Sequence, residues 1–231
     1  FYAGVGAAAT PKKGGTLTVG LETDVRGFDT VKGGVYGVSG RTVAGAIEEP
    51  LIMATEERGF APHLALAWES SADGKTWTVK LRKGVTFHDG KPFTADAVAK
   101  HYNRILDPKN KARARAFITA VASAEAVDDH TVKFSLMHPW HGFVPMLADR
   151  EMAGLIESPD QTAAGKQNRE PIGTGPFIFK EWRGGDRIVV TKNPNYWDKD
   201  KIHLDEIVYR ILPDPQTRFQ SLLAGDVDVI W

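Results

Sequence analysis

The chain has 231 residues, no cysteine, and 29 basic against 29 acidic side chains. Hydrophobic residues make up 42% and charged residues 25%, which is the balance of a globular protein with a buried core and excludes disordered or fibrous chains. The lack of cysteine excludes thiolate catalysis and cysteine-ligated metals, and the lack of a basic excess argues against a general nucleic-acid binder.

The N-terminal segment is small and apolar over its first nine residues and continues into Thr10-Pro11-Lys12-Lys13. This pattern is typical of the end of a secretory signal, where an apolar stretch meets a small-x-small cleavage site. A flexible Ala/Gly-rich leader is the alternative interpretation. We therefore expect residues 1–13 to be a signal remnant or a flexible leader. No apolar run in the chain approaches the ~18–20 residues that span a bilayer.

The first regular elements follow this segment directly. Apolar residues at every second position predict a strand over residues 16–21. A glycine-rich stretch over residues 27–45 predicts a loop that leads into a helix over residues 39–47. Pro50 follows soon afterwards, and the residue before a proline disfavours helical geometry, so we expect the helix to end there.

The middle of the chain combines strand and helix patterns. Alternating apolar residues next to turn signals predict strands over residues 77–81, 86–88 and 132–136. Thr94 is a suitable N-cap for a helix over residues 95–106, because its hydroxyl can accept a hydrogen bond from a free backbone N–H. A further helix or loop is expected around Phe117.

The last part of the chain returns to strands. Alternating apolar residues predict strands over residues 177–179, 188–190, 207–211 and 227–231. A helix is expected to begin near Pro215 and to stop before Gly225, because proline favours helix starts and glycine favours helix ends. Mixed strands and helices of this kind predict an α+β or α/β fold. We interpret the chain, which stops on a new strand, as a fragment.

Four stretches of the sequence form a recognisable set: residues 14–20, residues 67–98, residues 171–177 with 193–197, and residues 222–228. Together they resemble the extracytoplasmic solute-binding proteins, family 5, which serve ABC importers of dipeptides, oligopeptides and nickel. The resemblance extends from residue 14 to residue 231. Its longest block, AWESSADGKTWTVKLRKGVTFHDGKPFTADAV, is too long to match by chance.

The resemblance implies a periplasmic-binding-protein-like type II lobe with an inserted α+β domain. On this basis residues 14–48 and 170–231 form the first ligand-binding lobe, which is incomplete, and residues 49–169 form the inserted domain. The second lobe of the family is missing. Members of the family close two lobes over a solute, so a single lobe is expected to bind weakly.

The resemblance also implies four candidate ligand contacts. Tyr36 and Arg41 lie in the glycine-rich segment that lines the cleft of the family, where an aromatic face and a guanidinium can hold a peptide backbone or a carboxylate. Phe117 and Arg150 come from segments that approach the cleft in relatives. A surface role without ligand contact is the alternative for each. The basic stretch over residues 109–115 is interpreted as a solvated face, with contact to a partner such as the permease as the alternative.

Metal binding and catalysis lack the patterns they need. His138 and His141 are three residues apart, but Pro139 favours a turn and no third ligand keeps a regular spacing. The adjacent carboxylates Glu48 and Glu49 are expected to point apart, since neighbours in an extended segment face opposite sides. The sequence contains no nucleophile-elbow, P-loop, dinucleotide-binding or HExxH motif. We therefore predict no metal, no cofactor and no enzymatic activity.

The predicted function is the capture of a small solute, a peptide by preference, for delivery to the permease of a membrane ABC importer. The expected protein is a periplasmic monomer that meets the membrane only peripherally and does not bind nucleic acid. The alternative function is a truncated interaction or regulatory module that derives from this family but does not take part in transport.

Overall fold

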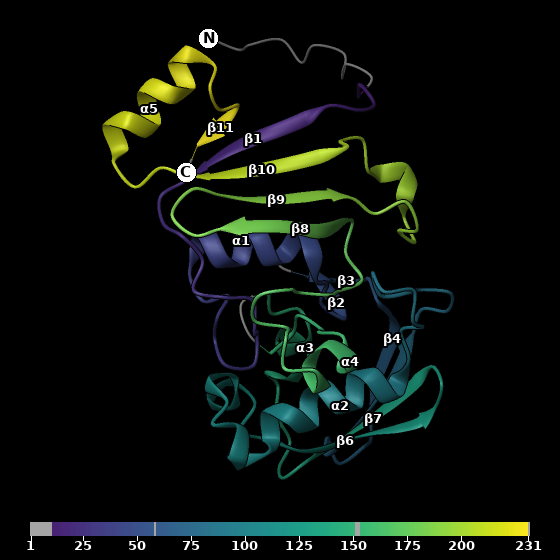
Figure 1. The fold of residues 1–231 in the computed structure, drawn as a ribbon. Helices are drawn as coiled ribbons and strands as arrows, with labels where there is room; N and C mark the ends of the chain where they lie inside the picture. The colour runs from purple at the N-terminus through teal and green to yellow at the C-terminus, as the bar shows by residue number, and fades with distance from the viewer. Residues whose placement is uncertain (1–10, 58, 151–152, 231) are drawn as a thin grey trace.

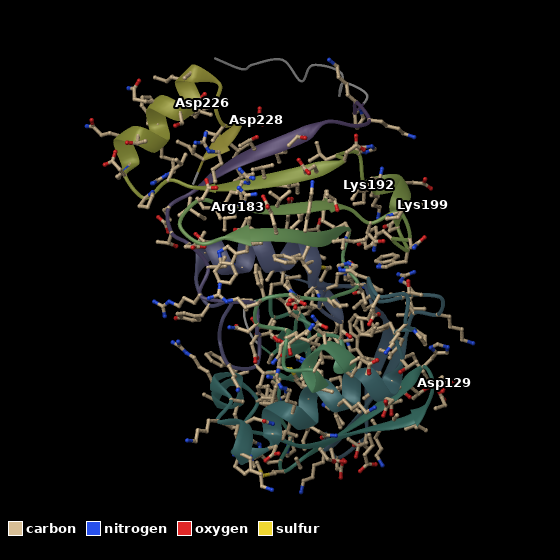
Figure 2. The ribbon with its side chains drawn as sticks, in the orientation of Figure 1. Asp129, Arg183, Lys192, Lys199, Asp226 and Asp228 are labelled. Carbon is tan, nitrogen blue, oxygen red and sulfur yellow. The ribbon has the colours of Figure 1, made fainter. Side chains whose placement is uncertain are left out.

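The computed structural model describes residues 11–57, 59–150 and 153–230. Within them, the strands form a five-stranded sheet, a four-stranded sheet and a two-stranded hairpin. Figure 1 shows the five-stranded sheet at one end of the molecule and the four-stranded sheet at the other. Polar and charged side chains lie along the outline of both parts, such as Asp226 beside the first sheet and Asp129 beside the second (Figure 2).

The five-stranded sheet joins the two ends of the described chain. Its strand order is β11-β1-β10-β9-β8, with β1 parallel to β10 and β11, and β9 antiparallel to β10 and β8. The strands are β1 (Thr16–Leu21), β8 (Phe177–Arg183), β9 (Arg187–Lys192), β10 (Glu206–Ile211) and β11 (Val229–Ile230). In the parallel register Val19 lies opposite Tyr209, and both side chains enter the same core. The alternating pattern is clearest in β10, which buries Ile207, Tyr209 and Ile211 and leaves the residues between them only partly covered.

Two helices accompany this sheet, α1 (Val38–Ile47) and α5 (Pro215–Ala224). Helix α1 lies under β8, between the sheet and the rest of the molecule, and buries Val43 and Ile47 in the core of the sheet (Figure 1). Asp214 caps the start of α5 by accepting a hydrogen bond from the Thr217 backbone N–H at 2.7 Å. Gly225 ends α5 in the left-handed conformation that glycine favours, with φ of 79°.

The four-stranded sheet is antiparallel throughout, in the order β4-β5-β7-β6. Its strands are β4 (Ala65–Ser70), β5 (Thr76–Leu81), β6 (Val121–Asp128) and β7 (Thr131–Leu136). Helix α2 (Ala95–Leu106) begins after the Thr94 cap and packs on this sheet. The core between them contains an edge-to-face pair, Tyr102 with Phe134, whose ring centroids are 5.0 Å apart.

Short elements connect the two sheets. The hairpin consists of β2 (Ile52–Ala54) and β3 (Phe60–Pro62), and two short helices follow β7: α3 (Phe143–Leu147) and α4 (Pro159–Ala163). Single 3₁₀ turns are formed by Pro108–Asn110, Arg113–Phe117 and Lys199–Lys201. The division of the chain into a first lobe and an inserted domain at residues 48, 49, 169 and 170 stays a prediction.

Most of the predicted elements are confirmed, but the strand over residues 86–88 was wrong. Only Thr86 forms a bridge, with Pro92, and Phe87 donates its N–H to the Lys91 carbonyl at 2.8 Å in a tight reversal. Gly90 has φ of 82° in this reversal, which leaves too few residues for a ladder. The final strand is shorter than predicted, and its last expected residue, Trp231, lies outside the described residues, as do residues 1–10 of the expected leader.

Candidate ligand-binding surface

The glycine-rich loop before α1 packs against the 3₁₀ turn Arg113–Phe117. The backbone N–H of Ala114 donates to the Val31 carbonyl at 3.2 Å, and the Arg113 guanidinium lies 4.3 Å from the centre of the Tyr36 ring. Gly33 has φ of 83°, and a Cβ at this position would come within 2.9 Å of Arg113 Cδ. Glycine is therefore required here both by the backbone conformation and by the close passage of the arginine.

Two of the four predicted ligand contacts belong to the elements that this contact joins. Tyr36 is 44% exposed and Phe117, at the end of the same 3₁₀ turn as Arg113, is 52% exposed. Large aromatic side chains that stay exposed beside a cation are the groups that hold amphipathic ligands. The basic residue Arg113, assigned to a solvated face from sequence, is thus placed in the candidate surface itself.

The other two predicted residues, Arg41 and Arg150, lie along α1. Arg41 is exposed on its first turn, and Gly45 follows one turn later on the same face. The guanidinium of Arg150 donates to the Gly45 carbonyl, with 3.5 Å between Nη2 and the oxygen. The structure therefore places Arg150 against the helix that carries Arg41, while Tyr36 contacts Arg113, at the start of the 3₁₀ turn that ends at Phe117. Whether any of the four contacts a ligand stays a prediction.

A pocket of about 500 Å³ opens beside the Tyr36–Arg113 contact. Its lining combines three cations with glycines, amides and one acid: Arg26, Asp29, Lys32, Gly33, Gly34, Arg113, Gly165, Gln167 and Asn168. The wall comes from the glycine-rich loop, from the 3₁₀ turn and from the segment after α4. Three parts of the chain that are far apart in sequence thus form one polar pocket.

The acidic residue of this pocket, Asp29, is buried and fully engaged. Its carboxylate accepts hydrogen bonds from Arg104 Nη2 at 2.6 Å, Gln167 Nε2 at 2.8 Å and the Lys32 backbone N–H at 3.0 Å. Burial alone would raise the pKa of Asp29, but the hydrogen bonds, led by that from Arg104, hold the pKa below its ordinary value. Asp29 is therefore ionised, and its charge is directed toward Arg104.

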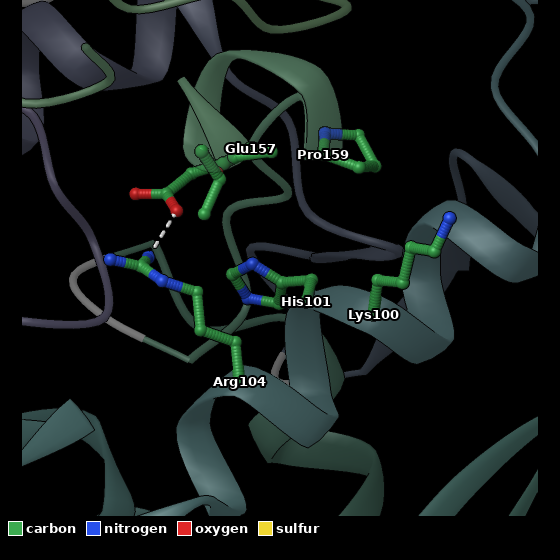
Figure 3. A pocket seen from close by; sticks show the side chains of 7 residues that line it. Lys100, His101, Arg104, Glu157 and Pro159 are labelled. Atoms are coloured by element: carbon green, nitrogen blue, oxygen red, sulfur yellow. Dashed lines mark hydrogen bonds and ion pairs between the residues drawn. The ribbon is translucent and has the colours of Figure 1, made fainter. Parts of the chain in front are cut away.

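Arg104 joins the loop to a second buried carboxylate, Glu157 (Figure 3). Its Nη1 lies 2.7 Å from Glu157 Oε2, and the other oxygen of Glu157 accepts the Thr30 backbone N–H at 2.6 Å. Burial and the charge of Asp29 raise the pKa of Glu157 to about 7, although Arg104 opposes the shift. These contacts hold the glycine-rich loop, which carries Tyr36, against α2 and the segment before α4.

A smaller cavity of about 220 Å³ lies beside this network, between α2 and α4. Figure 3 shows His101, Arg104, Glu157 and Pro159 around it. His101 Nε2 lies 3.1 Å from the Ala153 carbonyl, and burial lowers the pKa of His101 to about 4. The ring is therefore neutral, with Nε2 as the donor.

Among the histidines, His88 is held by backbone groups of another segment. His88 Nε2 lies 3.0 Å from the Gly175 carbonyl, and the Gly173 backbone N–H donates to His88 Nδ1 at 3.4 Å. His88 thus ties its turn to the segment before β8. His138 and His141 are exposed, and the part of the chain that the structure describes contains no group of three potential metal ligands.

The described helices include none that combines the length and the apolar character needed to cross a membrane.

Comparison with known proteins gives the family. The family model described as bacterial extracellular solute-binding proteins, family 5 Middle, matches residues 59–231, well over half of the chain. The chain belongs to this family.

Family 5 relatives of known name cover most of the chain. The di/tripeptide-binding protein 2 of Pseudomonas aeruginosa is 33% identical over 99% of this chain and 46% of its own length. The glutathione-binding protein GsiB of Pectobacterium atrosepticum is 36% identical over 80% of this chain and 36% of its own length. The chain thus spans less than half the length of these relatives.

Solved structures agree with the family assignment. The periplasmic binding protein AgaA of A. tumefaciens R10, in complex with agropinic acid, superposes with a TM-score of 0.85 at 38% identity, over 94% of this chain and 43% of that one. The oligopeptide-binding protein AppA of Bacillus subtilis, in complex with a nonapeptide, gives a TM-score of 0.85 at 27% identity, over 94% of this chain and 44% of that one. The chain therefore has part of the fold of a periplasmic binding protein.

The residue patterns did not single out the three cations that line this pocket. Arg26, Lys32 and Arg113 are 87 residues apart at the extremes and meet only in the folded chain. Lys32 directly precedes the glycines of the loop, which is the one local signal that could have indicated it. Nothing in the spacing of Arg26 or Arg113 identifies them.

Proposed function

We propose that the chain is part of a periplasmic carrier that captures a small solute of the peptide class and delivers it to the permease of an ABC importer. The observation that carries this proposal is the exposed Tyr36–Arg113 stack beside a polar pocket, in a chain of family 5. A ring face and a guanidinium next to glycine backbone can hold an extended peptide through packing and hydrogen bonds.

The relatives support a carrier rather than an enzyme. Their names and structures refer to di- and tripeptides, glutathione, nickel, agropinic acid and a nonapeptide as bound molecules. The mechanism that follows is lobe closure over the solute, with no covalent chemistry. The periplasmic location, the permease as partner and a monomeric state belong to the same proposal. Residues 14–48 with 170–231 would form one lobe, and residues 49–169 the inserted domain.

The test is thermal unfolding of the protein at its full natural length, alone and with di- to pentapeptides, sugars and nickel. A solute that binds only the native state stabilises it by ~2.7 kcal/mol at a hundredfold excess over its dissociation constant. We expect a peptide to raise the midpoint, and Tyr36→Ala to reduce that rise. Phe60→Ala is the matched control, because Phe60 is an exposed aromatic residue on β3. Cooperative unfolding that no solute shifts would instead favour the interaction or regulatory module.

A further inference from the structure

The pocket beside Tyr36 has an unbalanced charge. Arg26, Lys32 and Arg113 line it and are all exposed, whereas its one acid, Asp29, is only 3% exposed and directs its charge toward Arg104. Within the described chain, none of the three cations forms an ion pair with a carboxylate of the protein. The open part of the pocket therefore presents positive charge that the protein itself does not neutralise.

A second group in the pocket lacks a partner. Gln167 is 7% exposed, and its Nε2 donates to Asp29, which defines the orientation of the amide. Its Oε1 is buried and accepts no hydrogen bond from any described residue. A buried acceptor without a donor is unfavourable, and a ligand N–H could reach this oxygen only if the amide turned toward the pocket. The wall behind the cations thus contains an unsatisfied acceptor.

Arg113 links this pocket to the rest of the candidate surface. Its side chain passes over Gly33 and its guanidinium stacks on the Tyr36 ring, so its planar N–H groups are held in a defined position at the pocket mouth. An arginine held in this way can form two parallel hydrogen bonds to a carboxylate. Lys32 and Arg26 add charge without the same geometric restriction.

We propose that this pocket selects solutes that carry a carboxylate beyond those of the peptide termini, that is, acidic peptides or acidic amino-acid derivatives. Arg113 binds this carboxylate, with Lys32 and Arg26 as supporting charges. The inference rests on the proposed carrier function and adds the charge class of the solute.

The experiment compares three tripeptides by titration calorimetry on the protein at its full natural length. Ala-Glu-Ala, Ala-Gln-Ala and Ala-Lys-Ala differ in one side chain only. We expect Ala-Glu-Ala to bind at least tenfold more tightly than Ala-Gln-Ala, and the preference to shrink as salt is raised, since partly exposed charges are screened. Ala-Lys-Ala is expected to bind most weakly.

Arg113→Gln and Arg115→Gln form the matched pair of variants. Both residues are exposed on the same 3₁₀ turn, but only Arg113 lines this pocket. Arg113→Gln should abolish the preference for Ala-Glu-Ala, whereas Arg115→Gln should retain it, with unchanged unfolding temperatures as the check on folding. Equal binding of acidic and neutral peptides would overturn the inference and leave the carrier function standing. If no tripeptide and no other solute binds, the carrier function fails, and the inference with it.

Discussion

Two neighbouring carboxylates at the end of α1 have opposite surroundings, although both are buried. Glu49 Oε1 accepts from the Tyr196 hydroxyl at 2.6 Å and lies 2.8 Å from His63 Nε2. Its Oε2 accepts from the Thr174 hydroxyl at 2.7 Å and from Trp197 Nε1 at 3.3 Å. Neither oxygen of Glu48 has a hydrogen-bond partner among the described residues.

The backbone explains why these neighbours differ. Glu48 is extended, with φ of −119° and ψ of 149°, so the two side chains leave the chain in opposite directions. Glu49 meets donors from the segment before β8, from the segment between β9 and β10, and from the residue after β3. Glu48 instead faces the buried charges of Glu157 and Asp29. Burial, together with these two charges, raises the pKa of Glu48 well above its ordinary value. The comparison shows that donors, rather than burial, decide whether a buried carboxylate is stabilised.

The largest effect is expected from removal of the well-satisfied carboxylate. Glu49→Ala leaves the donors of Tyr196 and Thr174 buried without an acceptor and removes the acceptor of Trp197. We expect it to lower the free energy of unfolding by on the order of 3–5 kcal/mol. Urea unfolding measures the loss. Glu49→Gln keeps one acceptor oxygen and should lose clearly less. A loss below about 1 kcal/mol for Glu49→Ala would mean that these hydrogen bonds contribute little to the stability of the fold.

Replacement of the unsatisfied carboxylate of Glu48 should have the opposite effect and increase stability relative to wild type as the pH rises. Because the pKa of Glu48 is raised in the native state, the native protein retains a proton that the unfolded chain releases above its ordinary pKa of 4.5. Glu48 therefore makes the free energy of unfolding of the wild-type protein decrease as the pH rises, by up to about 1.4 kcal/mol per pH unit. Glu48→Gln removes the titration, so its stability relative to wild type should increase from pH 5 to pH 8 in urea unfolding. A relative stability that stays constant over this range would contradict the assignment.

The smallest effect is expected at the surface. Glu125 forms an ion pair with Lys133 across β6 and β7, at 2.9 Å, with both side chains largely exposed. Exposed pairs gain little because water and salt screen them, so Glu125→Gln should change the free energy of unfolding by less than about 1 kcal/mol, at every pH between 5 and 8. This variant therefore serves as the baseline for both buried carboxylates. A larger change would mean that carboxylate loss alone, without burial, destabilises this fold.

Local patterns predicted the regular elements well. The expected strand, helix and strand form at residues 16–21, 95–106 and 207–211. Each was predictable because the spacing of apolar residues within the segment itself indicates a strand or a helix. The Thr94 and Gly225 helix ends were predicted for the same reason, since a cap depends on its immediate neighbours. The strand expected over residues 86–88 failed because its partner segment comes after a turn of too few residues.

The sequence by itself determined the mixed α/β elements and the family, since each depends on a local pattern or on ordered blocks. The candidate contacts Tyr36, Arg41, Phe117 and Arg150, which the family resemblance implied, stay predictions. Only the tertiary structure decided that Arg113 stacks on Tyr36, that Arg26, Lys32 and Arg113 surround one pocket, and that Glu49 is satisfied while Glu48 is not. Electrostatic and hydrogen-bond partners come from segments that are distant along the chain. Their surroundings therefore depend on how the segments pack, which no single stretch of residues specifies.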